Sequence, residues 1–151
     1  MTELETGIVR LRICNMEVKE IIDKAVELGA CQRSSKATDW KSLAWLFFSP
    51  QGLEFCKKYN YPSIDTFRQM DNVISSYGVH VDSDCRLDNA DVALVGESLS
   101  ELHFSNTDRP YKVVLMHGAK AKIYAGMYAV VKVENISGEY EVFNDGTATV
   151  I

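Results

Sequence analysis

Three short segments in the second half of the chain repeat one alternation of apolar and polar residues. They are SELHF, AKIYA and GEYEV, which begin at Ser100, Ala121 and Gly138. Successive side chains of a β-strand point to opposite faces, so every second residue of each segment faces the same side. A shift of one residue would turn the apolar set toward solvent, and this restricts how the segments align.

Aligned in this way, the segments predict columns of side chains that run across neighbouring strands. The inward columns are Leu102 with Ile123 and Tyr140, and Phe104 with Ala125 and Val142. The outward columns are Glu101 with Lys122 and Glu139, and His103 with Tyr124 and Glu141. Upstream of each segment, Val92, Val113 and Val130 align in the same way. The column of Glu, Lys and Glu alternates in charge, which favours parallel neighbours in this register.

A repeat of 17 to 21 residues with several short strands per unit is typical of a β-solenoid. The segments MHGAK, AGMY, ENISG and FNDG supply glycine, asparagine and aspartate for its corners. The sequence therefore predicts an α+β chain in which residues 76–151 form a short parallel β-solenoid of about three to four coils. An antiparallel β-sandwich or meander gives a similar pattern and remains the alternative.

Residues 1–75 are predicted to form a helical region packed on the solenoid. Four segments carry helix signals: Asn15, Ser49 and Ser63 are the expected N-caps, the second helix is expected to begin at Asp39, and Gly29 and Asn60 are the expected stops. Residues 6–14 alternate as a strand would, with a poorly ordered extension as the alternative. The aromatic residues between 40 and 67 are expected in the core, with an exposed partner-binding patch as the alternative.

Composition narrows the classes of function. The net charge is −5, with ten basic and ten acidic residues in 1–75 but six basic and eleven acidic in 76–151. This balance argues against a nucleic-acid partner, which needs clustered Lys and Arg. The four cysteines show no C-x-x-C pair and are expected to be reduced. The N-terminus lacks a secretory signal pattern, and the longest apolar run, LAWLFF, predicts neither a membrane span nor membrane binding. We expect a cytoplasmic protein.

The sequence contains no G-x-x-x-x-G-K-[ST], G-x-G-x-x-G, H-E-x-x-H or G-x-S-x-G pattern. The acidic stretch 82–88 lacks the glycine and the final glutamate of an EF-hand, so it is expected to be a solvated loop. We therefore predict no catalytic residue, no metal site and no cofactor.

Five residues are the candidate partner-binding positions. Lys120, Lys122 and Tyr124 lie in a basic stretch of the acidic half, which suits a negatively charged partner. Val150 and Ile151 lie where the last strand edge needs covering. The expected function is a non-catalytic protein-interaction or regulatory accessory protein that binds a protein partner. The alternatives are a self-assembling structural module joined through solenoid ends, and an enzyme or small-ligand binder with an unrecognised site.

In coil length and in the valine-rich starts of its strands, the second half resembles short β-solenoid modules of the bactofilin type. The segments LFFSPQGLEFC and VVLMHGAKAKIYA together resemble those of small bacterial proteins associated with mobile elements. The resemblance implies a bacterial accessory protein, and it implies no catalytic residue.

Overall fold

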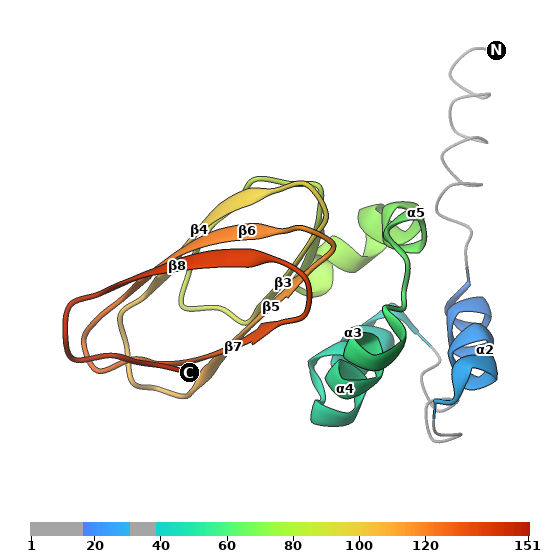
Figure 1. The fold of residues 1–151 in the computed structure, drawn as a ribbon, viewed down its shortest axis with the longest axis horizontal. Coiled ribbons are helices and arrows are strands. Elements are labelled where there is room, and N and C mark those ends of the chain that lie inside the picture. Colours follow the sequence, from blue (N-terminus) through green and yellow to red (C-terminus); the bar gives the residue numbers. More distant parts are fainter. Residues whose placement is uncertain (1–16, 31–38) are drawn as a thin grey trace, which may run out of the picture. The chain divides into compact units, whose positions relative to one another are not determined.

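The computed structural model describes residues 17–30 and 39–151, and the chain divides into two compact units between Tyr77 and Gly78. The predicted strand at residues 6–14 lies outside the described residues. Elements are labelled as in Figure 1. The first unit contains helices α2 (Val18–Leu28), α3 (Trp40–Phe48), α4 (Pro50–Tyr59) and α5 (Ile64–Ile74), followed by the 3₁₀ turn η2 (Ser75–Tyr77).

The helix boundaries follow from local capping. Asp39, Ser49 and Ser63 each accept a hydrogen bond from the backbone N–H three residues on, at 2.8, 3.0 and 3.2 Å. Gly29 (φ 119°) and Asn60 (φ 50°) adopt the left-handed conformation that ends α2 and α4. The N-caps predicted at Ser49 and Ser63, the helix start predicted at Asp39 and the stops predicted at Gly29 and Asn60 are confirmed. Asn15 lies outside the described residues, within which the N-cap residue of α2 is Glu17, with no side-chain capping bond.

The aromatic residues of the first unit divide between core and surface. Phe67 is buried, and Phe47 packs on it with ring centroids 5.5 Å apart. The Tyr61 hydroxyl donates a buried hydrogen bond of 2.9 Å to the Ile21 carbonyl, which joins α2 to the segment before α5. Trp45, by contrast, is 77% exposed. The core prediction therefore holds for part of this set only.

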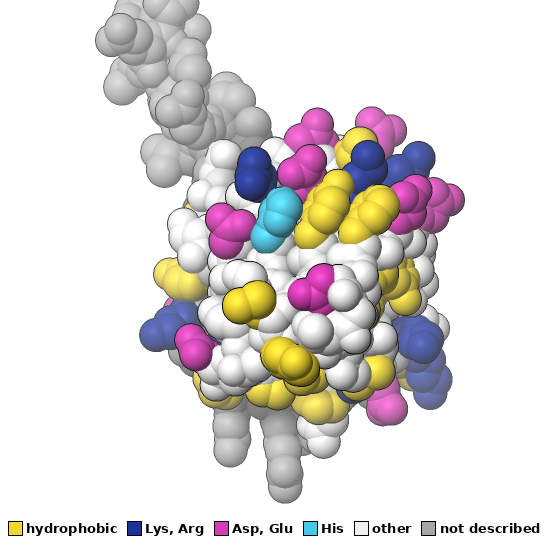
Figure 2. Space-filling model, turned by 90° about the vertical axis from the view of Figure 1, so that its left-hand side faces the viewer, with side chains coloured by type: hydrophobic (Ala, Val, Ile, Leu, Met, Phe, Trp, Pro, Cys, Tyr) yellow, Lys and Arg dark blue, Asp and Glu magenta, His cyan; other side chains and the backbone are white. Residues whose placement is uncertain are grey.

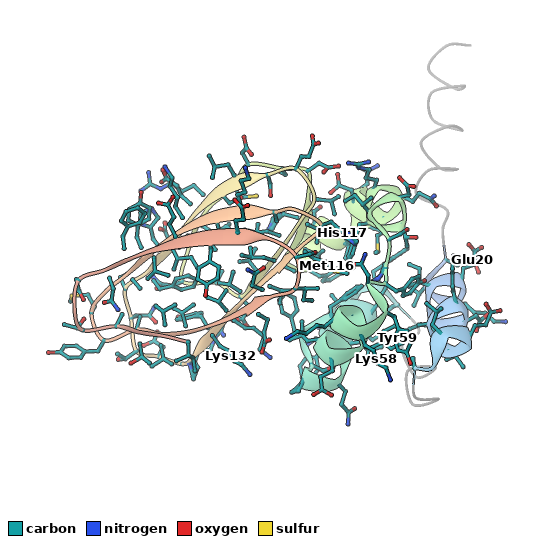
Figure 3. The ribbon with its side chains drawn as sticks, viewed as in Figure 1. Glu20, Lys58, Tyr59, Met116, His117 and Lys132 are labelled. Atoms are coloured by element: carbon teal, nitrogen blue, oxygen red, sulfur yellow. The ribbon has the colours of Figure 1, made fainter. Side chains whose placement is uncertain are left out.

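The second unit contains short strands in two sheets, and their side chains fill the space between them (Figure 3). Sheet A has the order β1-β3-β5-β7-β9, and sheet B has the order β2-β4-β6-β8. The strands of sheet A are β1 (Val79–Val81), β3 (Val92–Val95), β5 (Tyr111–Met116), β7 (Val130–Asn135) and β9 (Thr149–Val150). The strands of sheet B are β2 (Arg86–Asp88), β4 (Leu99–Phe104), β6 (Lys120–Ala125) and β8 (Glu139–Asn144).

Consecutive strands alternate between the two sheets, and every strand pair among the described residues is parallel. In Figure 1 each pass of the chain lies beside the previous one, from β3 and β4 to β7 and β8. The alternative of an antiparallel sandwich or meander is therefore wrong. The described fold is a mixed one, with four α-helices and two parallel sheets.

The predicted register is correct for two segments and wrong for the third. Leu102 pairs with Ile123 and Phe104 with Ala125, as the alignment predicted. Ile123, however, pairs with Val142 rather than with Tyr140, so the third segment lies two residues from its predicted place. A shift of two keeps every side chain on its predicted face, and alternation alone cannot detect it.

The register of sheet A is corrected in the same way. Val92 pairs with Val113, as predicted. Val113 then pairs with Val133 rather than with Val130. Val131 is fully buried, whereas Val130 is exposed. The sequence separation between paired residues of β5 and β7 is three longer than predicted. Because three is an odd number, the side chains of β7 point to the opposite faces from those predicted.

Side chains at the corners bind the backbone of the next pass. Asp82 Oδ1 accepts from the Glu97 N–H, and Asp84 Oδ1 accepts from the Leu99 N–H, both at 2.8 Å. Asn89 Oδ1 accepts from the Ser105 N–H at the same distance. The acidic stretch 82–88 is therefore not merely a solvated loop, because its carboxylates satisfy backbone donors of the following turn.

Candidate interaction surface

The outer face of sheet B gathers three of the five predicted site residues. Lys120, Lys122 and Tyr124 are alternate residues of β6, so their side chains project from the same face. Lys122 pairs with Glu101 on one side and with Glu141 on the other, and Arg86 pairs with Glu101. This column therefore alternates between basic and acidic residues over all four strands of the sheet.

An aromatic stack runs beside the charged column. His103 and Tyr124 stack with ring centroids 4.8 Å apart and an interplanar angle of 7°. Tyr124 and Phe143 stack at 4.8 Å and 15°. His103 Nε2 also lies 3.4 Å from Glu101 Oε2. Figure 2 shows a face on which acidic, basic and hydrophobic side chains intermingle, with a histidine beside hydrophobic side chains.

The stack includes a residue that the sequence alignment missed. The alignment placed Glu141 beside Tyr124, but the register places Phe143 there. The signal was present in the sequence, because EYEVF carries an aromatic residue two positions after Glu141, as KIY does after Lys122. Phe143 is 46% exposed and is the last ring of the stack.

Strand β8 is the edge strand of this surface. It lies at the end of the order of sheet B, and all six of its residues are exposed. Tyr140, Val142 and Phe143 are therefore apolar side chains in contact with solvent. Exposed apolar residues on an edge strand are typical of a site that pairs with another strand.

The other two predicted site residues lie on sheet A rather than beside the lysines. Val150 belongs to β9 and pairs with Val131, and it packs against the core between the sheets. Ile151 is 67% exposed, although its backbone N–H and carbonyl bond to Val131 and Val133. The structure therefore brings together Lys120, Lys122 and Tyr124, and places Val150 and Ile151 on the other sheet.

The corner after β6 is a further exposed apolar feature. Met127 (φ 52°) and Tyr128 (φ 61°) are consecutive left-handed residues, and Tyr128 is 70% exposed. This conformation is uncommon for large side chains. The next corner holds it: Met127 N–H donates to Asp145 Oδ2 at 3.2 Å, and Tyr128 N–H to Thr147 Oγ1 at 3.0 Å. Hydrogen bonds from Thr147 lower the pKa of Asp145 and keep this acceptor ionised.

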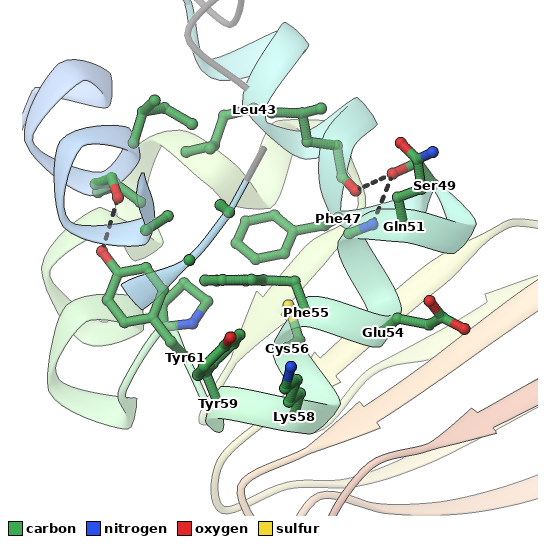
Figure 4. A pocket seen from close by; sticks show the side chains of 18 residues that line it. Leu43, Phe47, Ser49, Gln51, Glu54, Phe55, Cys56, Lys58, Tyr59 and Tyr61 are labelled. Atoms are coloured by element: carbon green, nitrogen blue, oxygen red, sulfur yellow. Dashed lines mark hydrogen bonds between the residues drawn. The ribbon is translucent and has the colours of Figure 1, made fainter. Parts of the chain in front are cut away.

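The first unit contains a cavity of about 580 Å³, lined mainly by apolar side chains of α2, α3 and α4 (Figure 4). Leu43, Phe47 and Phe55 contribute to its wall. Burial raises the pKa of the Cys56 thiol to about 12 and that of the Tyr61 hydroxyl to about 12. Both groups are protonated at neutral pH, so the cavity suits an apolar occupant better than nucleophilic chemistry.

Among residues 17–30 and 39–151, no three His, Cys, Asp or Glu side chains are grouped so as to hold a metal ion. Within the same ranges, no helix has the length and apolar character needed to cross a membrane. Comparison of the chain with protein-family models, with curated proteins and with solved structures found no match.

Proposed function

We propose that this protein is a non-catalytic protein-interaction or regulatory accessory protein of the bacterial cytoplasm, and that it binds its partner through the outer face of sheet B. The observation that carries the proposal is the stack of His103, Tyr124 and Phe143 beside a charged column. Aromatic residues flanked by polar ones are enriched where protein surfaces bind each other. The face ends at an exposed strand, which offers backbone groups in addition.

We also infer that the second unit is a short parallel β-solenoid. Its strands alternate between two sheets, and matching positions recur every 19 to 21 residues from Val92 onward. In such a fold each coil contacts only its neighbours, so a flat face and two ends are available to partners. This architecture supports a binding module, because it presents regularly spaced side chains on a rigid surface.

The test is affinity purification of the tagged full-length chain from its native cells, followed by mass spectrometry. The binding variant is Lys120→Glu with Lys122→Glu, and the matched control is Lys19→Glu with Lys24→Glu, which makes the same charge change on exposed positions of α2. We expect the first variant to lose a partner that the control retains. Retention of every partner by both variants would contradict the proposed surface. Circular dichroism of both variants confirms that each is folded.

Self-assembly through the solenoid ends is a second candidate, favoured by the exposure of Ile151 beside edge strand β9. It predicts that the particle mass measured by light scattering increases with protein concentration. The variant Ile151→Lys should instead give the mass of a single chain. A concentration-independent mass would remove this candidate while leaving the first intact.

Binding of a small apolar ligand is a third candidate, favoured by the cavity of the helical unit, whose volume is in the range of small-molecule sites. It predicts that an apolar fluorescent probe binds the wild-type protein. The probe should bind Leu43→Trp more weakly, because the larger side chain fills the cavity. Equal probe binding by the variant would argue against this site.

A further inference from the structure

The free edge of β8 carries a defined set of backbone N–H donors and carbonyl acceptors. Glu139 N–H donates to Ala119 O at 2.9 Å, and Asp145 N–H donates to Ala125 O at 3.0 Å, so the odd-numbered groups face β6. Backbone groups alternate sides along a strand, and those of Tyr140, Val142 and Asn144 therefore face the opposite edge. No strand of the described residues pairs with that edge. Its donors and acceptors are available to an added strand.

The side chains of β8 specify what such a strand should carry. On the β6 side, Lys120 pairs with Glu139, Lys122 with Glu141, Ile123 with Val142 and Tyr124 with Phe143. Each of these four β8 residues therefore has a complementary neighbour on β6 and none on the free edge. A parallel strand added on the free edge would meet the same four side chains in the same order. The matching sequence is basic, any, basic, apolar, aromatic.

We propose that the β8 edge binds, by parallel strand addition, an extended segment of a partner protein with the pattern basic–any–basic–apolar–aromatic. The inference rests on the proposed interaction function and names the chemistry of the partner. Lys or Arg of the segment lies opposite Glu139 and Glu141. Its aromatic ring extends the stack beyond Phe143, whose exposed ring is the last one in place. Backbone bonds supply affinity, and these side chains supply the register.

A second copy of this chain is a poorer occupant of the same edge. Antiparallel pairing of β8 with β8 centred on Tyr140 would set Glu139 of each copy opposite Glu141 of the other, and like charges on adjacent strands are destabilising. The charge pattern of β8 therefore favours a basic segment of another protein over self-pairing.

Strand β6 itself supplies the natural probe. The synthetic peptide GAKAKIYAG, which repeats residues 118–126, carries the required pattern, and GAEAEIYAG is its charge-reversed control. Binding to the full-length chain is measured by fluorescence anisotropy of labelled peptides at low ionic strength. We expect the basic peptide to bind about tenfold more tightly than the acidic one, because two favourable pairs replace two repulsive ones.

A charge exchange on the protein gives the decisive comparison. The variant Glu139→Lys with Glu141→Lys should prefer GAEAEIYAG, reversing the order of affinities. Phe143→Ala should weaken both peptides several-fold without changing which one the protein prefers. Hydrogen exchange should show protection of the Tyr140, Val142 and Asn144 amides when peptide is bound. Since Glu139, Glu141 and Phe143 are exposed, these variants are expected to fold, and circular dichroism confirms it.

Equal affinity for the two peptides, an unchanged preference after the exchange, or protection elsewhere would overturn the inference. Sedimentation of the protein alone tests self-pairing: a dimer that Glu139→Lys with Glu141→Lys alters would identify a second copy as the occupant and would also overturn it. If the peptides fail but partner capture still depends on Lys120 and Lys122, the proposed function stands and only the β8 inference falls. If both fail, the proposed function falls as well.

Discussion

At the scale of single residues, Gly52 in the first turn of α4 lies against the backbone at the end of α3. A Cβ added there would lie 1.8 Å from the Leu46 carbonyl oxygen and 2.8 Å from its carbon. Both atoms belong to the backbone, so relief requires movement of the helix end. We expect Gly52→Ala to lower the free energy of unfolding by roughly 1–3 kcal/mol despite the higher helix propensity of alanine.

Chemical denaturation measures this loss, and Gln51→Ala is the matched control, because Gln51 is exposed one position earlier on α4. The control should be neutral or slightly stabilising. Equal stability of Gly52→Ala and the wild type would show that the turn relaxes freely.

The buried thiol of Cys56 makes stability depend on alkaline pH. Burial raises its pKa from 9.0 in the ordinary case to about 12 in the folded chain. Below pH 9 the thiol is protonated in both states and stability is unaffected. Between pH 9 and 12 the unfolded chain releases the proton first, so stability falls by about 1.4 kcal/mol per pH unit. Tyr61 adds to the fall, because burial raises its pKa from 10.0 to about 12.

We expect Cys56→Ala to reduce this alkaline slope when unfolding is measured between pH 8 and 11. Leu53→Ala, a buried neighbour on α4 without a titrating group, should lower stability by the same amount at every pH. An identical slope in the wild type and Cys56→Ala would contradict the assignment.

At the scale of elements, the aromatic stack couples β4, β6 and β8. Tyr124 lies between His103 and Phe143, with ring centroids 4.8 Å from each. Stacked aromatic pairs contribute about 0.5–1.5 kcal/mol beyond the area they bury. We therefore expect a double-mutant cycle of Tyr124→Ala and Phe143→Ala to give a coupling energy in this range, measured by denaturation.

The control cycle pairs Lys120→Ala with Phe143→Ala. Both residues project from the same face, but the register places Lys120 beside Glu139 and not beside Phe143. Its coupling energy should be near zero, and similar values for the two cycles would show that the stack is energetically unimportant.

The elements also show which predictions were accessible from the sequence. The caps at Asp39, Ser49 and Ser63 were predictable, because a capping bond joins residues three apart and depends on little else. The pairing of Leu102 with Ile123 was predictable because both segments share one alternation. The pairing of Ile123 with Val142 was not, since a displacement of two residues leaves the pattern of faces unchanged.

At the scale of the whole molecule, the chain divides into two compact units, each with buried residues of its own. Leu43 is buried in the first unit, and Ile123 in the second. Truncating either residue to alanine should cost about 2–5 kcal/mol. We expect Leu43→Ala to accelerate hydrogen exchange in α3, α4 and α5 while leaving the strands unchanged, and Ile123→Ala to do the reverse.

Equal acceleration throughout both units by either variant would instead indicate one cooperative structure. That result would support the prediction that the helical region packs on the second unit, which this experiment tests directly.

The sequence by itself determined the local features of this protein: the helix ends, the location of the strands and the alternation of their side chains. These depend on contacts within a few residues, and each residue type signals them directly. Tertiary structure alone decided the registers of β7 and β8, that Phe143 rather than Glu141 continues the stack, and that β8 stays uncovered. The number of residues in each corner sets those pairings. A corner that is two residues longer or shorter leaves the alternation of apolar and polar residues in the adjoining strands unchanged.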